Sequence, residues 1–159
     1  MVANSRFAIA VHAATTLAYR QARGAEYVSS EELAASVRTN PVAVRRIIRA
    51  LVRAGVVATK EGKGGGARLA RPPRRIPLLQ IYQAVEDDGR VLAHHPNPPN
   101  PACPVSCGIE GALAPVFGAV ADAVDRTLGR VTLADVLDRI WTTRSPSGNL
   151  RSIAPRSEL

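Results

Sequence analysis

The sequence predicts a mainly α-helical protein, with a winged helix-turn-helix domain that carries a small two-stranded wing and a long C-terminal dimerisation helix. Three helical patterns with start and stop signals fill residues 5 to 55, and two β-rich segments flank a glycine-rich loop at 61 to 66. An apolar stripe at helical spacing follows at 109 to 128. The 159 residues fit one compact domain with an appended element and argue against a large enzyme, so no catalytic residues are predicted.

Positive charge is concentrated in the first half of the chain. Residues 1 to 76 hold 14 Lys or Arg against 4 Asp or Glu, a net charge of +10. Residues 77 to 159 hold 7 against 9, a net charge of −2, and the two values add up to the total of +8. A basic module joined to a mildly acidic one indicates a division of labour, in which the first half binds a polyanion.

Local signals define three helices in the first half. The first is expected from Ser5 to about Gln21, with Ser5 as an acceptable N-cap, and a short second helix follows the hydroxyl cap of Ser29 and Ser30. Asn40 as N-cap and Pro41 at the first helical position begin a third helix, which is expected to end at Gly55. The apolar stripe predicted for this third helix consists of Val44, Ile47, Ile48, Leu51 and Val52.

Arginines occupy the other face of the third helix, and the strands expected at 56 to 60 and 67 to 70 enclose a basic, glycine-rich loop. In a winged helix-turn-helix, the third helix enters the DNA major groove and the hairpin reaches the backbone or the minor groove. The alternative to DNA contact is that these arginines only form a solvent-exposed face of the helix. The predicted partner is double-stranded DNA, contacted by Asn40, Val42, Arg45, Arg46, Arg49, Lys60, Lys63, Gly64, Gly65 and Arg68.

The second half begins with a stiff link at 71 to 75 and a coupling helix at 76 to about 86, followed by a proline-rich loop up to 101. A long amphipathic helix comes next, and Pro115 predicts a break or kink near Ala114. Thr132 is expected to cap a last helix at 133 to 140. The dimerisation stripe predicted on the long helix is Ile109, Leu113, Val116, Val120, Val124 and Leu128.

These elements divide the chain into three parts. Residues 1 to 76 form the DNA-binding domain, residues 77 to 141 hold the coupling helix, a cysteine loop and the dimerisation helices, and residues 142 to 159 are expected to be a disordered tail. No apolar run is judged to approach the ~20 residues of a bilayer span, and the first residues lack a cleavage site. The protein is therefore expected in the cytoplasm, without membrane contact.

Several motifs together resemble the Rrf2 family of bacterial transcription regulators over roughly residues 1 to 141. They are SSEELAASV, NPVAVRRIIRALVRAGVV, EGKGGGARLARPP, IPLLQIYQAVE, the cysteine loop and VTLADVLDRI. The resemblance implies a homodimer, in which the long helix crosses its partner and two winged domains face a pseudo-palindromic operator. An amphipathic helix after a small domain agrees with this, although its stripe has the alternative of packing within the same chain.

The wing departs from the family pattern at two positions. Where the family often has an arginine before the glycines, this chain has Glu61, and Ala67 replaces the usual aromatic residue. Insertion of an arginine at position 61 into the minor groove is therefore excluded. Lys60 or Lys63 is expected to contact phosphate instead, and the operator preference is expected to differ from that of the best-known members.

The two cysteines, Cys103 and Cys107, are predicted to be the sensor. Family members that sense iron–sulfur status or nitric oxide have three cysteines in this loop, and Cys103, Cys107 and His94 or His95 only approximate the four ligands of a cluster. No cofactor or metal is therefore predicted, with a cluster or zinc site as an alternative. The Cys-Pro-Val segment resembles the thiol-sensing branch of the family, whose members respond to oxidants or electrophiles.

The expected position of Cys103 on the helix also favours a reactive thiol. Pro104 suits the first position of a helix, which places Cys103 at a helix N-terminus, where the helix dipole favours a thiolate. Cys107 lies about one turn later and is a candidate resolving thiol, within one subunit or between two. The alternatives are that both cysteines are small buried residues without chemistry and that His94 and His95 are exposed loop residues.

Taken together, these observations predict a sequence-specific DNA-binding transcription regulator, a repressor, whose DNA affinity responds to oxidation or electrophile modification of Cys103, with Cys107 assisting. Alternatives are an iron–sulfur regulator of the Rrf2 type, a ligand-responsive regulator without cysteine chemistry, and a DNA-binding scaffold. A small thiol oxidoreductase is disfavoured, because the two cysteines lack the C-x-x-C spacing and no βαβ pattern accompanies them. Sequence alone leaves open the operator, the target genes, the inducing signal and whether binding represses or activates.

Overall fold

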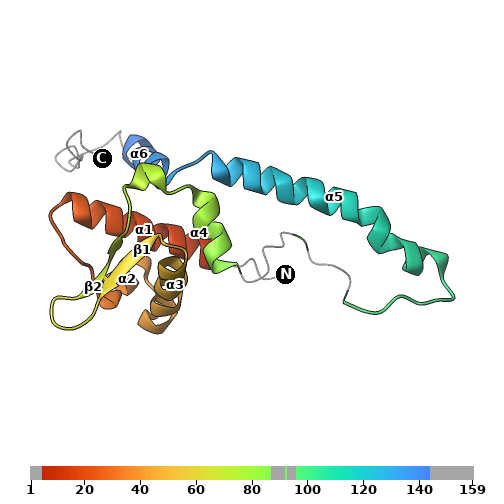
Figure 1. Cartoon of the computed structure of the whole chain (residues 1–159), viewed down its shortest axis with the longest axis horizontal. Helices are drawn as coiled ribbons and strands as arrows, with labels where there is room; N and C mark the ends of the chain where they lie inside the picture. Colours follow the sequence, from red (N-terminus) through yellow and green to blue (C-terminus); the bar gives the residue numbers. More distant parts are fainter. Residues whose placement is uncertain (1–4, 87–91, 93–95, 144–159) are drawn as a thin grey trace.

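The computed structural model describes residues 5–86, 92 and 96–143 of the chain. A helical bundle with a hairpin on one side forms the body of the molecule, and one long helix projects from it as an arm (Figure 1). In chain order, the elements are α1 (Arg6–Ala22), α2 (Ser30–Val37), α3 (Pro41–Arg53), β1 (Val57–Lys60), β2 (Gly66–Leu69), the 3-10 turn η1 (Pro73–Arg75), α4 (Leu78–Val85), α5 (Pro104–Gly129) and α6 (Leu133–Thr143). The predicted fold class is therefore confirmed.

Side-chain caps begin α2 and α3 where the sequence predicts them. The Ser29 hydroxyl accepts a hydrogen bond from the Glu32 N–H at 3.2 Å, and the Glu32 carboxylate accepts one from the Ser29 N–H at 3.1 Å, which completes a capping box. The Asn40 side-chain oxygen accepts the Val42 N–H at 2.8 Å. Ser5 precedes α1, but its side chain makes no capping hydrogen bond.

The core of the bundle is a continuous apolar cluster to which α1, α2, α3, the hairpin, α4 and α6 all contribute. Four of the five residues predicted as the stripe of α3 are buried, whereas Val52 is 37% exposed and the prediction for it is wrong. The four buried residues already fill the contact between α3 and the rest of the bundle, so Val52 lies at the edge of the apolar stripe. Residues that are fully buried include Leu17, Leu33, Leu51, Val56, Ile76, Ile81 and Leu133.

The wing is a two-stranded antiparallel hairpin that pairs with a third segment of the chain. Val57 lies opposite Leu69 and Lys60 opposite Gly66. Val28, just before α2, exchanges two backbone hydrogen bonds with Ala67, of 2.9 and 2.8 Å. A Cβ atom at Gly66 would lie 2.4 Å from the Val28 carbonyl oxygen, and Gly66 has φ of +149°, so this close approach requires glycine.

The arm, α5, is one continuous helix of 26 residues with Pro115 inside it, so, of the break or kink expected near Ala114, the break does not occur. A proline ring crowds the carbonyl of the residue four positions earlier, which here is Gly111. Gly111 and Pro115 are both exposed, so water can bond to the Gly111 carbonyl, which receives no N–H from the proline. The Cys103 end and the C-terminal end of the arm are therefore connected by a single helix.

The arm is also long and apolar enough to cross a membrane by length and composition, since it holds a window of mean hydropathy 1.4. The expectation that no run approaches this length was wrong, because residues 104–121 hold a single charged residue, Glu110. Composition alone does not separate a membrane span from a helix that packs on another protein.

The base of the arm is fastened to the body by backbone hydrogen bonds. The Leu78 N–H donates to the Val131 carbonyl at 2.8 Å, and the Leu133 N–H donates to the Ile76 carbonyl at 2.9 Å. These two bonds enclose an antiparallel bridge between Pro77 and Thr132. We call this pair of bonds the clamp; it connects the start of α4 to the turn between α5 and α6.

The last helix begins at the predicted cap and extends further than expected. The Thr132 hydroxyl accepts a hydrogen bond from the Asp135 N–H, while the Asp135 carboxylate accepts bonds from the Thr132 N–H at 2.7 Å and its hydroxyl at 2.8 Å. The helix continues to Thr143, so Thr142 and Thr143 are helical rather than part of a tail. The rest of the expected disordered tail, and His94 and His95, lie outside the described residues.

We expect Asp135→Asn to lower the urea midpoint of unfolding at neutral pH, with the difference from wild type shrinking in acid. The Thr132 backbone N–H and then its hydroxyl bond to the carboxylate and lower the pKa of Asp135. The ionised group therefore stabilises the fold above the unfolded pKa of about 3.9, and this contribution is lost as the pH falls through the lowered folded pKa. Urea titrations at pH 7 and pH 3 measure the effect.

The control for this variant is Asp138→Asn, which removes a carboxylate from an exposed position of the same helix. If both variants lose stability equally at neutral pH and recover equally in acid, the effect belongs to net charge and the capping role of Asp135 is contradicted.

Candidate nucleic-acid interface

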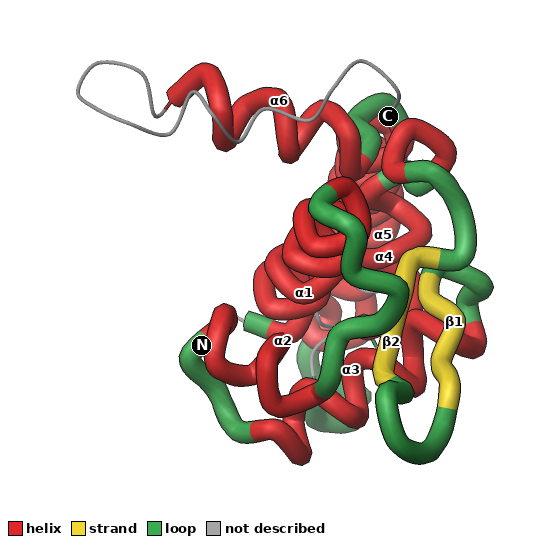
Figure 2. The backbone as a smooth tube through the Cα atoms, turned by 90° about the vertical axis from the view of Figure 1, so that its left-hand side faces the viewer, coloured by secondary structure: helices red, strands yellow, loops and turns green. Residues whose placement is uncertain are grey.

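The exposed face of α3 carries most of the residues predicted to contact DNA. α3 lies beside the hairpin in the bundle (Figure 2). The residues Asn40, Val42, Arg45, Arg46 and Arg49 are all exposed there, with Val42 at 51%. Three guanidinium groups and one small apolar side chain on an open helix face suit phosphate contacts and readout of base edges in a major groove.

One of these arginines is ion-paired with the preceding helix. The Arg45 guanidinium lies 2.5 Å from the Glu31 carboxylate of α2. Hydrogen bonds from the Glu31 backbone N–H, and then from Arg45, lower the pKa of Glu31 below its usual value. The pair orients Arg45 along the surface between α2 and α3. Sequence reasoning used Glu31 only as a favourable charge at a helix N-terminus and missed this contact.

A tyrosine that sequence reasoning did not select holds two cations of the wing. The Lys60 ammonium lies 5.5 Å from the centre of the Tyr27 ring, and the Arg68 guanidinium lies 5.3 Å from it. Both distances are within the range of cation–π attraction. Tyr27 immediately precedes Val28, which pairs with β2, so the backbone bridge places the ring beside both strands. Lys60 and Arg68 are thereby held on one side of the wing.

We expect Tyr27→Leu to weaken DNA binding about threefold to tenfold, because two cation–π contacts that pre-orient Lys60 and Arg68 are lost. The matched control is Tyr27→Phe, which keeps the ring and should bind as wild type does. Fluorescence anisotropy with duplex DNA at a fixed salt concentration measures both variants. Equal weakening in the two would mean that the hydroxyl group, and not the ring, is responsible.

The tip of the wing is shaped by its glycines. Lys63 and Gly64 are exposed at the tip, and Gly64 has φ of +74°, in the left-handed region. Gly65 is half-buried, and a Cβ atom there would lie 2.2 Å from the Lys60 carbonyl oxygen. Gly65 therefore serves the packing of the turn, while Lys63 and Gly64 are the positions open to a partner.

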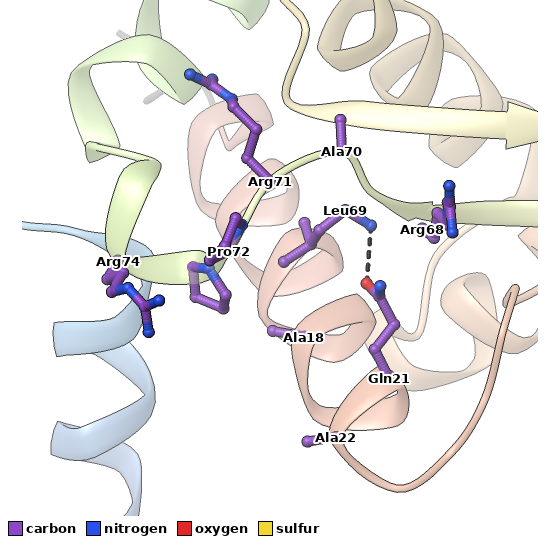
Figure 3. Close-up of a pocket in the computed structure, with 10 residues that line it drawn as sticks. Ala18, Gln21, Ala22, Arg68, Leu69, Ala70, Arg71, Pro72 and Arg74 are labelled. Carbon is purple, nitrogen blue, oxygen red and sulfur yellow. Dashed lines mark hydrogen bonds between the residues drawn. The ribbon is translucent and has the colours of Figure 1, made fainter. Parts of the chain in front are cut away.

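A hollow of about 490 Å³ lies between the end of α1 and the chain that follows β2. Gln21 fastens β2 to α1 there, because its side-chain oxygen accepts the Leu69 N–H at 2.8 Å (Figure 3). Arg68, Arg71 and Arg74 border the hollow but point in different directions (Figure 3). Arg71 donates to the Gln80 side chain at 2.6 Å. The arginines do not converge on a shared anion site.

The N-terminal end of α5, to which both cysteines belong, lies at the far end of the arm from the body (Figure 1). Cys103 is the N-cap residue of α5 and half-buried, Cys107 is exposed, and both are free thiols. The Cys107 thiol donates to the Asn100 carbonyl at 3.4 Å, and the Asn100 N–H donates to the Ser106 hydroxyl at 2.9 Å. The pair is therefore not buried in an apolar core, and the chain before α5 is tied to its first turn.

Two cysteines alone do not complete the ligand set of an iron–sulfur cluster within one chain. Protein-bound clusters usually have four ligands, most often cysteines. Over residues 5–86, 92 and 96–143, no three His, Cys, Asp or Glu side chains form a group able to hold a metal ion. His94 and His95, the further candidate ligands, lie outside the described residues.

The predicted dimerisation stripe is uncovered at its N-terminal end. In the single chain, Ile109, Leu113 and Val116 are 39%, 37% and 55% exposed, and no residue of α5 is buried. The remaining stripe residues, Val120, Val124 and Leu128, are half-buried nearer the body. Packing within the same chain therefore leaves the outer part of this stripe uncovered.

An exposed arginine helix, a basic hairpin and a projecting apolar arm define the class of winged helix-turn-helix transcription regulators. The family model of Rrf2, described as an iron-dependent transcriptional regulator, matches residues 3–139. The chain belongs to the Rrf2 family, a family of regulators and not of enzymes.

Individual relatives agree with this assignment. YwnA of Bacillus subtilis (strain 168), named as an HTH-type transcriptional regulator, is 38% identical over 138 residues, which are 87% of this chain and 98% of YwnA. A crystal structure described as that of a DNA-binding protein shares 35% identity at a TM-score of 0.66, covering 84% of this chain and 99% of that one. T. potens IscR, at 24% identity and a TM-score of 0.68 over 93% of this chain and 94% of that one, has the same fold.

Proposed function

We propose that this protein is a cytoplasmic homodimer that represses transcription by binding a pseudo-palindromic operator with α3 and the wing. The observation that carries this proposal is the exposed set of Arg45, Arg46 and Arg49 beside a wing whose cations are held on Tyr27. Asn40, Val42, Lys63, Gly64 and Arg68 complete the proposed contact surface, and Gly65 shapes it. Two such surfaces in one dimer would recognise two half-sites at a set spacing.

The proposed signal is oxidation of Cys103 and Cys107. With diamide, two thiols lose two protons and two electrons to the N=N bond, which becomes a hydrazine, and one disulfide forms. Within a chain or between the two chains of the dimer, such a bond removes the thiol hydrogen that Cys107 donates to Asn100. The turn before α5 then loses one of its ties. Because the thiols lie at one end of a continuous helix, this change reaches the dimer geometry along α5.

The test is an anisotropy titration against DNA from upstream of the protein's own gene, reduced and diamide-oxidised, at a stated salt concentration. We expect tight binding when reduced and at least about tenfold weaker binding when oxidised, in line with usual allosteric couplings. Cys103→Ser and Cys107→Ser should each abolish the response while leaving reduced binding intact. A response that survives in both variants would contradict the thiol switch and leave the DNA-binding proposal standing.

A further inference from the structure

A second groove, separate from the DNA-contact surface, lies between α1, α2 and α6. Its volume is about 550 Å³, which is within the range of small-molecule sites. In the part of the chain that the structure describes, none of the lining residues belongs to α3, the wing or α5. The groove is therefore also distinct from the apolar stripe assigned to dimerisation.

The walls of the groove suit a flat apolar body. Tyr19 of α1 and Trp141 of α6 contribute aromatic rings whose centres are 5.8 Å apart at an angle of 43°. Leu137 and Ile140 of α6 and Ala35 of α2 add aliphatic surface. Aromatic pairs at this separation attract further rings in offset or tilted arrangements. The shape and chemistry of the walls indicate an aromatic ligand.

The polar groups of the groove favour a ligand that accepts hydrogen bonds. The Ser36 hydroxyl lies 3.2 Å from the Thr16 hydroxyl and 3.3 Å from His12 Nε2. Arg20 lines the groove and donates to Glu32 at 3.3 Å. Glu32 is the acidic residue among the lining positions, and it already accepts bonds from Ser29 in the capping box. The groove thus offers hydroxyl and guanidinium donors beside an imidazole, while its carboxylate is occupied.

One donor in the groove is unsatisfied. Trp141 Nε1 is shielded from water and has no hydrogen-bond partner among the residues that the structure describes. A buried N–H without a partner costs free energy, and such groups are rare in native proteins. Trp141 lines the groove and lies near the end of α6, so a turn of its ring would bring this N–H to an acceptor held in the groove.

We propose that this groove binds a small aromatic carboxylate, with the ring against Tyr19 and Trp141 and the carboxylate toward the Trp141 N–H, Ser36 and Arg20. The groove lies between α2, which precedes the DNA-contact helix α3, and α6, which follows the arm. A ligand bound in the groove therefore favours one spacing of α2 and α6, and this changes DNA affinity. The effect on DNA affinity rests on the proposed function.

The binding test uses the full-length ¹⁵N-labelled protein without DNA and 3-phenylpropionate as the probe. Trp141 is the one tryptophan in the sequence, so its indole N–H gives a single, assignable cross-peak. We expect a saturable downfield shift of this peak, with affinity on the order of millimolar for a ligand of this size. 3-Phenylpropylamine, which keeps the ring and replaces the carboxylate by a cation, should give no saturable shift.

Two variants locate the site by calorimetry. Trp141→Phe keeps an aromatic wall without the N–H and should lower the affinity for 3-phenylpropionate about tenfold. Ala35→Leu fills the groove from an exposed position of α2 and should abolish binding. Ala8→Leu, at an exposed position of α1 outside the groove, is the matched control and should bind the probe as wild type does.

Three results would overturn the proposal. They are the absence of a saturable indole shift, equal binding of the amine, and undiminished binding by Ala35→Leu. Affinity that falls as the protein concentration rises would show that a second copy of the chain occupies the groove instead. Because the titration contains no DNA, these outcomes are independent of a failure to bind an operator. Saturable binding that leaves DNA affinity unchanged would overturn the regulatory role alone.

Discussion

Replacing Arg46 and Arg49 together by alanine is expected to weaken operator binding by about a hundredfold or more. Each guanidinium that contacts a base edge contributes about 1–3 kcal/mol, and each phosphate contact adds about one unit to the salt dependence. Both side chains are exposed on α3, so their removal leaves the buried stripe of that helix untouched. Anisotropy titrations over a range of salt concentrations give the loss in affinity and the change in slope.

The salt dependence also separates the two possible roles of these arginines. If they contact phosphate, affinity for specific and unrelated DNA falls equally and the slope drops; if one reads a base edge, discrimination between the two sequences falls as well. Arg139→Ala removes the same charge from an exposed position of α6 and is the control. A comparable loss in that control would indicate a general charge effect and count against α3 as the contact surface.

The second large effect is expected for Ile109→Asp combined with Leu113→Asp, which should convert the proposed dimer to monomers. Both side chains are exposed in the single chain, so charge there does not disturb the protomer's core, but it does place carboxylates in an interface that buries them. Sedimentation velocity should show the monomer. Affinity for a two-half-site operator should fall about a hundredfold or more, because the linkage of the two domains is lost.

The control for charge on the arm is Gly118→Asp. This position lies on the side of α5 away from the stripe, and a Cβ atom there would meet nothing within 4 Å. The control is expected to stay dimeric and to bind the operator as wild type does. If the stripe variant also remains dimeric, the interface lies elsewhere on the molecule, and the apolar arm needs another explanation.

Helix starts were predictable from the sequence because capping is local chemistry. Each cap spans four residues or fewer, Ser29 to Glu32 in one and Asn40 to Pro41 in the other. The spacing in the sequence therefore indicates which hydrogen bonds form. The wing was predictable for a similar reason, since its glycines separate two short β-rich segments. The apolar stripe of α5 also follows from periodicity alone, whereas the exposure of its N-terminal part does not.

The contacts that the sequence did not predict all join distant segments. Tyr27 meets Lys60 and Arg68 only because Val28 pairs with β2, and no local pattern reports that pairing. The Arg45 ion pair and the groove beside Trp141 likewise depend on how separate helices pack. Pro115 shows the opposite error, because the local rule allowed a break within what is one helix, whose turn at Pro115 is exposed to water.

The clamp at the base of the arm gives α5 the mechanics of a lever with a fulcrum. A helix of 26 residues is about 39 Å long. A tilt of roughly 5° at the clamp moves the opposite end by about 3 Å, from the length of the helix alone. The clamp binds Ile76 and Leu78, which directly follow η1. The segment on the other side of the fulcrum is therefore the chain that leads back through η1 to the wing. A small rotation at the clamp would therefore accompany a large displacement at the thiols and act on the chain that leads to the hairpin.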